Sequence, residues 1–475
     1  MTSPPPAYRP SVLGFIPTFA LAAQLLAAPD VVTTAPTQLF PFTVDTFDNG
    51  LTLVTVPTGP SGTVAYYTLV KAGARDEIEP GKSGYAHLFE HLMFRGTKAV
   101  PAREYEHKMQ SLGADANAFT TDDFTLYVPT IPKDSLAELI PLEADRFMHL
   151  DVAEAPYKDE TGAVLGELNK DMASPYWKMD EAMRELAFTK HTYGHTTIGY
   201  AQDVRAMPAG HAYSKAFFSR FYTPDDCVIF AVGDVKHDDV LARVTKAYAG
   251  WTGKRATTAT VTEPEQTEAR TKSLTWSGPT PPRMFVAYKV PAATNFEDAA
   301  AMAVLTTYLF GEPSDLNQRL VVKEQKLLSL SADPDDAVHK DPGLLPIGAT
   351  LKPGATSFDE IGAAIQAAFD GVAKGGTNPV EVAAARAHAK NALLLSMQTP
   401  GSIAITLAAM TARTGDVHGL DRYVAAIGKV TAEDLIRVAK AYFTPARRTT
   451  ITLSPPPPLP PAKTPVAATK KGGAK

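Results

Sequence analysis

Apolar residues along the chain alternate between helical and strand-like spacing. In several stretches they recur every three or four positions, which predicts amphipathic helices at 104–112, 136–148, 181–188 and 238–248. Short runs rich in β-branched and aromatic residues predict strands, most clearly at 63–71, 228–232, 284–290 and 449–453. Helices and strands mixed along one chain in this way predict an α+β fold.

Two segments more than two hundred residues apart repeat one pattern. Phe221-Tyr222-Thr223-Pro224 and Tyr442-Phe443-Thr444-Pro445 each end an amphipathic helix and lead into a predicted strand. The two prolines are 221 positions apart (445 − 224). This repeat predicts an internal duplication with two similar domains. We place them at 40–255 and 272–455, separated by a linker in which Thr, Glu and Ala replace the apolar pattern.

The two ends of the chain differ from these domains. An uncharged run from Val12 to Ala28, preceded by Arg9 and ending in small residues, is typical of a bacterial secretory signal. We therefore expect residues 1–30 to be a signal peptide, with an uncleaved membrane tether as the alternative, and the protein to be exported to the bacterial periplasm. Residues 456–475, rich in proline and then lysine, predict a disordered tail.

Composition narrows the function classes. A chain of 475 residues is too long for one ordinary core. Its net charge of −5 at pH 7 shows no excess of basic residues of the kind that binds nucleic acid. The single cysteine, Cys227, excludes an internal disulfide and a cysteine-based zinc site.

The chemistry of the chain is concentrated in the string His87-Leu88-Phe89-Glu90-His91. Two histidines four positions apart on a helix project from one face, so both imidazoles can reach one metal ion. Glu90 can polarise a water on that metal without being a ligand. We expect a helix here with Ser83 as its cap. The string is the H-x-x-E-H signature of the inverzincins.

The residues around this string resemble the pitrilysin family of metallopeptidases, which includes insulin-degrading enzyme and the mitochondrial processing peptidases. The resemblance rests on Gly73-Ala74-Arg75-Asp76-Glu77, on the segment 84–94 and on Gly96-Thr97, and it extends over about residues 40 to 455. It implies two homologous domains, each an antiparallel sheet with helices packed on one face. Together these would form half of a clam-shell that encloses a peptide.

A zinc hydrolase needs a third protein ligand and an open position for water. Glu167 follows His91 by 76 positions (167 − 91), which resembles the spacing of the family's glutamate ligand. Glu160 lies two helical turns earlier on the same helix face and matches a second acidic position of the family, which implies a supporting role beside the ligands. Without the upstream string, both would be read as solvated helix glutamates.

Substrate and partner predictions also follow from the resemblance. The stretches 117–121 and 125–127 match the family's segment beside the zinc, where a strand could bind an extended peptide by edge pairing. The substrate-binding residues that this match implies are Asn117, Ala118 and Phe119. In the second domain the region 314–330 lacks the glycine and tyrosine of active relatives, although Arg319 is present. We therefore expect a heterodimer with a homologous subunit that binds no zinc, or alternatively a second copy of the chain.

The sequence thus predicts a hydrolase, a zinc-dependent endopeptidase that cleaves peptides or unfolded protein segments through a zinc-activated water. One Zn²⁺ per chain would be held by His87, His91 and Glu167, with Glu90 as general base. The alternative is a non-catalytic pitrilysin-like subunit with a binding or assembly role. His191 and His195, also four positions apart, raise the alternative of a second metal, but Tyr193-Gly194 between them favours a loop.

Overall fold

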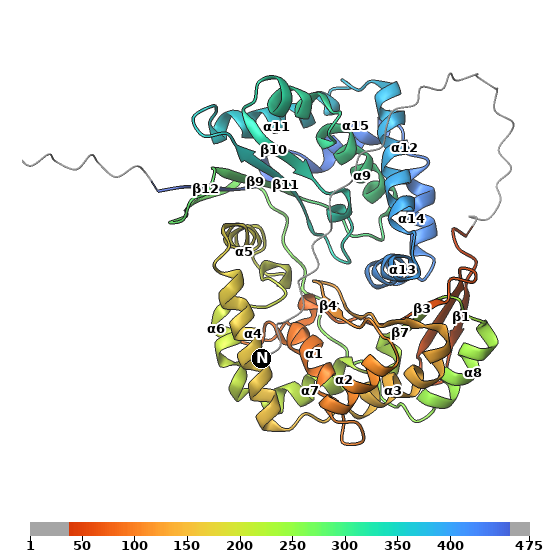
Figure 1. The fold of residues 1–475 in the computed structure, drawn as a ribbon. Coiled ribbons are helices and arrows are strands. Elements are labelled where there is room, and N and C mark those ends of the chain that lie inside the picture. The colour runs from red at the N-terminus through yellow and green to blue at the C-terminus, as the bar shows by residue number, and fades with distance from the viewer. Residues whose placement is uncertain (1–37, 457–475) are drawn as a thin grey trace, which may run out of the picture. The chain divides into compact units, whose positions relative to one another are not determined.

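A computed structural model describes residues 38–456 of the chain (Figure 1). The predicted signal at 1–30 and the predicted tail, apart from Pro456, lie outside the described residues. We call residues 43–248, which contain the first sheet and its helices, the first half, and residues 270–454, which contain the second sheet, the second half.

The first sheet follows the order β1-β2-β7-β3-β5-β4, and β6 also pairs with β3. Its strands are β1 (Thr43–Thr46), β2 (Thr52–Pro57), β3 (Thr63–Val70), β4 (Ala118–Thr120), β5 (Thr125–Tyr127), β6 (Thr130–Pro132) and β7 (Cys227–Gly233). Strand β7 lies between β2 and β3, parallel to β2 and antiparallel to β3.

The second sheet follows the order β10-β11-β9-β12-β8. Its strands are β8 (Arg270–Thr275), β9 (Arg283–Lys289), β10 (Leu327–Ala332), β11 (Leu344–Leu351) and β12 (Arg448–Ser454). Strand β12 is parallel to β8 and antiparallel to β9. The order β8-β12-β9-β11-β10 corresponds to β2-β7-β3-β5-β4 of the first sheet.

The α+β fold with two sheets and their helices is confirmed, but both sheets are mixed, whereas the resemblance implied antiparallel sheets. In each half the last strand is inserted between two earlier strands. It is parallel to one and antiparallel to the other, so each sheet contains one parallel pair.

The helices of the first half are α1 (Tyr85–Leu92), α2 (Ala102–Ser111), α3 (Leu136–His149), α4 (Glu154–Asp171), α5 (Pro175–Ala187), α6 (Ala201–Ala206), α7 (His211–Phe221) and α8 (His237–Tyr248). Those of the second half are α9 (Phe296–Phe310), α10 (Asp315–Asn317), α11 (Phe358–Ala373), α12 (Pro379–Ser396), α13 (Pro400–Thr414), α14 (Gly419–Ile427) and α15 (Ala432–Tyr442). No single helix in the described part of the chain is long and apolar enough to cross a membrane. Helices α12 and α13 together have the length and apolar composition of a membrane span, but the chain bends by 119° at the break between them. Length and composition are the only features that make this pair a candidate.

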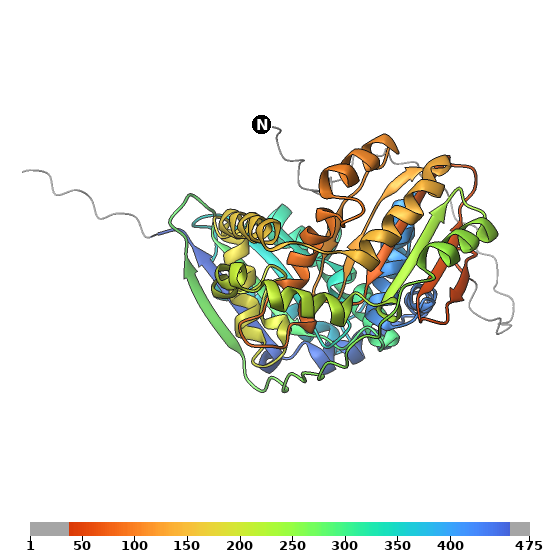
Figure 2. The same ribbon diagram turned by 90° about the horizontal axis from the view of Figure 1, so that it is seen from below.

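Both faces of the first sheet are buried along β3, which explains the continuous apolar run of this strand. Val64 and Tyr66 point into the core formed with the first half's own helices, in which α3 and α8 pack together (Figure 2). Ala65 and Tyr67 point to the opposite face and belong to the core shared with the second half. Helix α13 of the second half packs on β3 and β7 there.

The exchange of helices between the halves is reciprocal. Helix α5 of the first half packs on β8, β9 and β12 of the second sheet (Figure 1). Its buried residues Met179, Ala182 and Met183 form a small core with Ile451 and Leu453 of β12. Each sheet is therefore covered on one face by a helix from the other half, which ties the two halves together.

Candidate metal centre

Helix α1 carries the predicted string and is held at its start by a buried carboxylate. The backbone N–H groups of Gly84 and Ala86 both donate to the side chain of Glu77 at 2.6 Å. Ser83 is not the cap, contrary to our expectation, because its hydroxyl donates to Asp203 at 2.6 Å and the helix begins after Gly84. Gly84 has a φ of 88°, and a Cβ there would lie 2.3 Å from the carbonyl oxygen of Ile198. Only glycine fits this entry to the helix.

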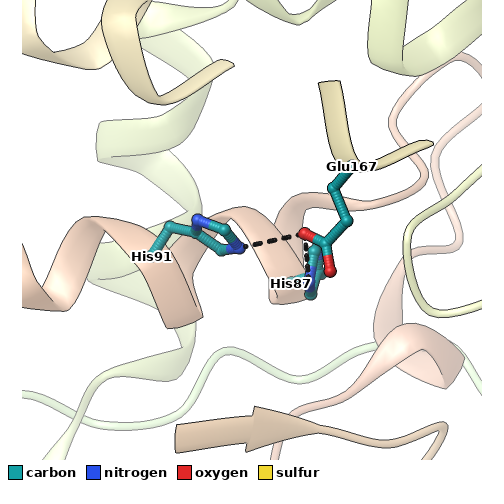
Figure 3. Close-up of side chains that lie close together, drawn as sticks. All are labelled: His87, His91 and Glu167. Atoms are coloured by element: carbon teal, nitrogen blue, oxygen red, sulfur yellow. Dashed lines mark ion pairs between the residues drawn. The ribbon is translucent and has the colours of Figure 1, made fainter. Parts of the chain in front are cut away.

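Three predicted ligands converge between α1 and α4, which pack against each other. The Nε2 atoms of His87 and His91 each lie 3.5 Å from Oε2 of Glu167 (Figure 3). One ligand atom from each residue lies within 4.8 Å of the other two. Among residues 38–456, no other group of three or more His, Cys, Asp or Glu side chains comes together in this way.

The spacing and chemistry of this group fit zinc. Ligands at zinc's usual bond lengths in a tetrahedron are roughly 3.4 Å apart, close to the observed 3.5 Å. Burial lowers the pKa of His87, which favours the neutral imidazole that a metal requires. The hydrogen bond with His91 and the proximity of His87 lower the pKa of Glu167 and so favour its carboxylate form. Two imidazoles and one carboxylate are a donor set used in catalytic zinc sites.

Glu160 supports His91 from the other side of the ring. Its Oε2 atom lies 3.3 Å from Nδ1 of His91, and its Oε1 atom pairs with Arg95. The Glu160 side chain is only 5% exposed. A buried carboxylate on the second ring nitrogen fixes the orientation of a ligating imidazole. The sequence singled out Glu160 but not its partner Arg95.

Glu90 is held by a residue that sequence reasoning did not single out. The hydroxyl of Thr120, at the end of β4, donates to Oε2 of Glu90 at 2.7 Å. Thr120 belongs to the matched stretch 117–121, which was the available signal, but only Asn117, Ala118 and Phe119 were predicted to bind substrate. A hydrogen bond to one carboxylate oxygen leaves the other free to act on a proton.

A cavity and an open strand edge adjoin Glu90. Strand β4 lies at one edge of the first sheet, where it pairs only with β5 among the described strands. A cavity of about 690 Å³ lies beside Glu90, His91 and Asn117. Apolar side chains in its lining include Phe94, Tyr105 and Met109, and polar ones include Arg103, Glu106 and Gln110. Asn117 of the predicted substrate segment thus lines the same cavity as the candidate base, Glu90.

Two family models match the chain in tandem. The model described as insulinase (peptidase family M16) matches residues 53–201, and the model described as peptidase M16 inactive domain matches residues 212–388. The chain belongs to peptidase family M16. The first model spans His87, His91 and Glu167, so the candidate ligands all lie in its range.

Individual relatives and solved structures resemble most of this chain. The zinc protease PqqE of Helicobacter pylori is 27% identical over 86% of this chain and 92% of its own length. The crystal structure of a protease from Helicobacter pylori has a TM-score of 0.80 at 26% identity, and the match covers 88% of this chain and all of that one. The periplasmic protease PqqL of Escherichia coli shares the fold, with a TM-score of 0.70 at 16% identity, over 87% of this chain and 47% of its own.

The other histidine pair is not part of this candidate site. His191 accepts the N–H of Tyr193 at Nδ1, and its Nε2 atom lies 3.1 Å from Asp341. His195 Nδ1 lies 2.9 Å from the carbonyl oxygen of Thr196. Because the two rings are engaged by different groups, they do not form the second metal site that their spacing raised as an alternative.

Arg319 lies away from the metal ligands of its own chain. It lies in the segment Gln318–Lys323, half-exposed, and its Nε atom is 4.0 Å from Glu324. It lines a cavity of about 930 Å³ together with residues of α11 and α12, whereas the described residues that line the cavity beside Glu90 all belong to the first half. Within this chain, Arg319 therefore does not complete the candidate active site.

Proposed function

We propose that the protein is a zinc-dependent endopeptidase that hydrolyses peptides or unfolded protein segments. The observation that carries this proposal is the convergence of His87 and His91 on Glu167 of α4, with each Nε2 atom 3.5 Å from Oε2 of Glu167. The two histidines lie on α1, the helix that also bears Glu90. The chain belongs to family M16 and has zinc proteases among its relatives, which supports the same chemistry.

The roles of the residues follow from their positions. His87, His91 and Glu167 would hold the metal, which when bound supplies Lewis-acid chemistry by polarising the scissile carbonyl and acidifying a water. Glu90 takes a proton from the attacking water and passes it to the leaving amine. Glu160 keeps the His91 ring in place, since it holds the nitrogen that does not face the other ligands.

Substrate selection would combine a backbone contact with a side-chain contact. An extended peptide can pair with the open edge of β4, and backbone pairing of this kind accepts many sequences. The cavity beside Glu90 would then receive a side chain next to the scissile bond. Because Phe94, Tyr105 and Met109 form part of its lining, a large apolar side chain can pack against them.

The proposal is tested with purified full-length protein, a quenched fluorescent peptide and a metal chelator. We expect cleavage that the chelator abolishes and that stoichiometric Zn²⁺ restores. Cleavage that is insensitive to the chelator would contradict the metal mechanism. A zinc-loaded, folded protein that cleaves no peptide would favour the alternative, a non-catalytic subunit with a binding or assembly role.

We further propose that a second chain completes the site, either a homologous subunit without zinc or a second copy. The first half carries the candidate chemistry, whereas Arg319 faces a different cavity and the family's glycine and tyrosine are absent from 314–330. A facing half-shell would exclude water and align the peptide. If the chain alone is monodisperse and zinc-loaded, and the candidate homologue does not raise its rate, the heterodimer proposal fails.

Export to the periplasm is the location we propose. It rests on the apolar run that ends in small residues within 1–30, and PqqL of Escherichia coli, a periplasmic protease, shares the fold. Intact-mass analysis of protein from the native host should give a mature chain that begins between about Ala23 and Val31. A chain that retains Met1 or Thr2 would contradict cleavage of a signal.

A further inference from the structure

The hydrogen bond between Thr120 and Glu90 depends on a short hairpin. Thr120 is the last residue of β4, which has three residues and pairs only with β5 among the described strands. The turn 121–124 joins the two strands. It is closed by Thr121, whose N–H donates to the carbonyl oxygen of Phe124 at 2.8 Å and whose hydroxyl accepts the Phe124 N–H at 3.1 Å. The position of this turn therefore determines where the Thr120 hydroxyl points.

The first half holds the turn from one side. The loop that precedes α1 runs against it, with the N–H of Arg75 donating to the carbonyl oxygen of Asp122 at 2.8 Å. A Cβ on Gly73 would lie 2.5 Å from the backbone nitrogen of Phe124, so this approach requires glycine. Arg184 of α5 donates to both carboxylate oxygens of Asp122, at 3.0 and 2.9 Å.

The second half holds the turn through Asp123, which is 2% exposed. The backbone N–H of Lys340 donates to Oδ2 of Asp123 at 3.1 Å, and Nε of Arg413 lies 3.9 Å from the same oxygen. The Oδ1 atom accepts a short hydrogen bond from the hydroxyl of Tyr193. That hydroxyl in turn accepts the backbone N–H of Asp341 at 3.2 Å.

A buried carboxylate is costly unless its partners stay in place. Both carboxylate oxygens of Asp123 depend, directly or through Tyr193, on residues 340, 341 and 413 of the second half. A shift of these residues would leave the carboxylate buried with fewer donors. The turn is therefore coupled to the second half, although that half contributes no predicted metal ligand.

We propose that Thr120 and Asp123 are positioning residues for Glu90: Thr120 orients its carboxylate, and Asp123 fixes the hairpin that carries Thr120 to the second half. This inference rests on the proposed function, because it gives Glu90 the role of general base. It also gives the second half a part in catalysis besides enclosing the substrate.

The first test compares Thr120→Val with Thr120→Ser in the full-length, zinc-loaded protein. Valine keeps the shape but removes the donor, so we expect kcat to fall about tenfold, with KM within about twofold and zinc content unchanged. Serine keeps the hydroxyl and should restore most of the lost kcat. A Thr120→Val protein with native kcat, alongside an inactive Glu90→Gln protein, would overturn this inference and leave the proposed function standing.

The second test is a double-mutant cycle with Asp123→Asn. If Asp123 acts through Thr120, the double variant should have the kcat of Thr120→Val alone, and additive losses would contradict this route. Rates are expressed per folded, zinc-loaded molecule, so a loss of stability alone does not count as a change in kcat.

The matched control is Asp134→Asn, an exposed aspartate that should leave kcat unchanged. If Asp123→Asn does not fold, Arg413→Gln takes its place in the cycle, with the same two outcomes.

Discussion

Glu160 and Glu167 hold opposite sides of one imidazole ring. Oε2 of Glu160 lies 3.3 Å from Nδ1 of His91, and Oε2 of Glu167 lies 3.5 Å from its Nε2. Both glutamates come from α4, two turns apart on the same face. One helix thus supplies a candidate ligand and the residue that orients another, so the geometry of the site depends on how α4 packs against α1.

Removing the charge of Glu160 should weaken metal binding without removing a ligand. We expect Glu160→Gln to lower zinc affinity about 10- to 100-fold, because the His91 ring loses the carboxylate that orients it. Competition with a chromophoric chelator measures this affinity. The control is Glu154→Gln on the same helix, where the glutamate is exposed and, within residues 38–456, pairs only with Lys158. Unchanged affinity in Glu160→Gln would rule out the supporting role.

Narrowing the cavity beside Glu90 should change which peptides are cleaved. We expect Met109→Trp to lower kcat/KM about tenfold for peptides with a large apolar residue next to the scissile bond, because the added ring occupies the space for that side chain. Peptides with alanine there should be cleaved at near-native rates. Met172→Trp, at a more exposed methionine outside the cavity, is the control. Equal losses for both peptide classes would contradict side-chain selection by this cavity.

Lys289 should make stability depend on pH. Its buried Nζ lies 3.1 Å from the centre of the Phe188 ring and has no hydrogen-bond partner among the described residues. Burial lowers the pKa of Lys289 to about 7 in the folded protein. In the unfolded chain a lysine titrates at about 10.4, so between these values the unfolded state binds more protons and the free energy of unfolding rises with pH.

The matching variant is Lys289→Met, which keeps the length of the side chain and removes the charge. We expect it to raise the free energy of unfolding by at least about 1 kcal/mol at pH 7 and to flatten the rise between pH 7 and 9.5. Denaturant titrations at several pH values measure both effects. Lys272→Met, at an exposed lysine of β8, should leave the slope unchanged. A slope that persists in Lys289→Met would mean that another group causes it.

Local patterns predicted much of the fold because they depend on near neighbours. The periodicity at 136–148 and the apolar run at 63–71 became α3 and β3 with bounds shifted by one residue. The pairing of β2 with β7 was not accessible, because it joins residues about 175 positions apart and no local pattern encodes it. Likewise, the helical pattern at 181–188 predicted a helix but not that α5 packs on the second sheet.

The candidate site, too, was predicted from local patterns only in part. His87 and His91 follow from helical spacing, whereas Glu167 required the resemblance to a known family, because its distance in sequence has no local meaning. The Ser83 cap was wrong because a carboxylate from an earlier loop, Glu77, meets the first amides of α1 instead. Thr120 was not singled out, because its contact with Glu90 exists only once the hairpin is folded against α1.

The most direct test of the account measures zinc content and peptide cleavage together in Glu90→Gln. We expect about one zinc per chain, as in the native protein, and a rate at least about 10²-fold lower, because Gln cannot take the proton. His91→Ala and Glu167→Ala should instead lose both zinc and activity, since each removes a candidate ligand. A Glu90→Gln protein that binds zinc and cleaves peptide at close to the native rate would contradict the proposed mechanism.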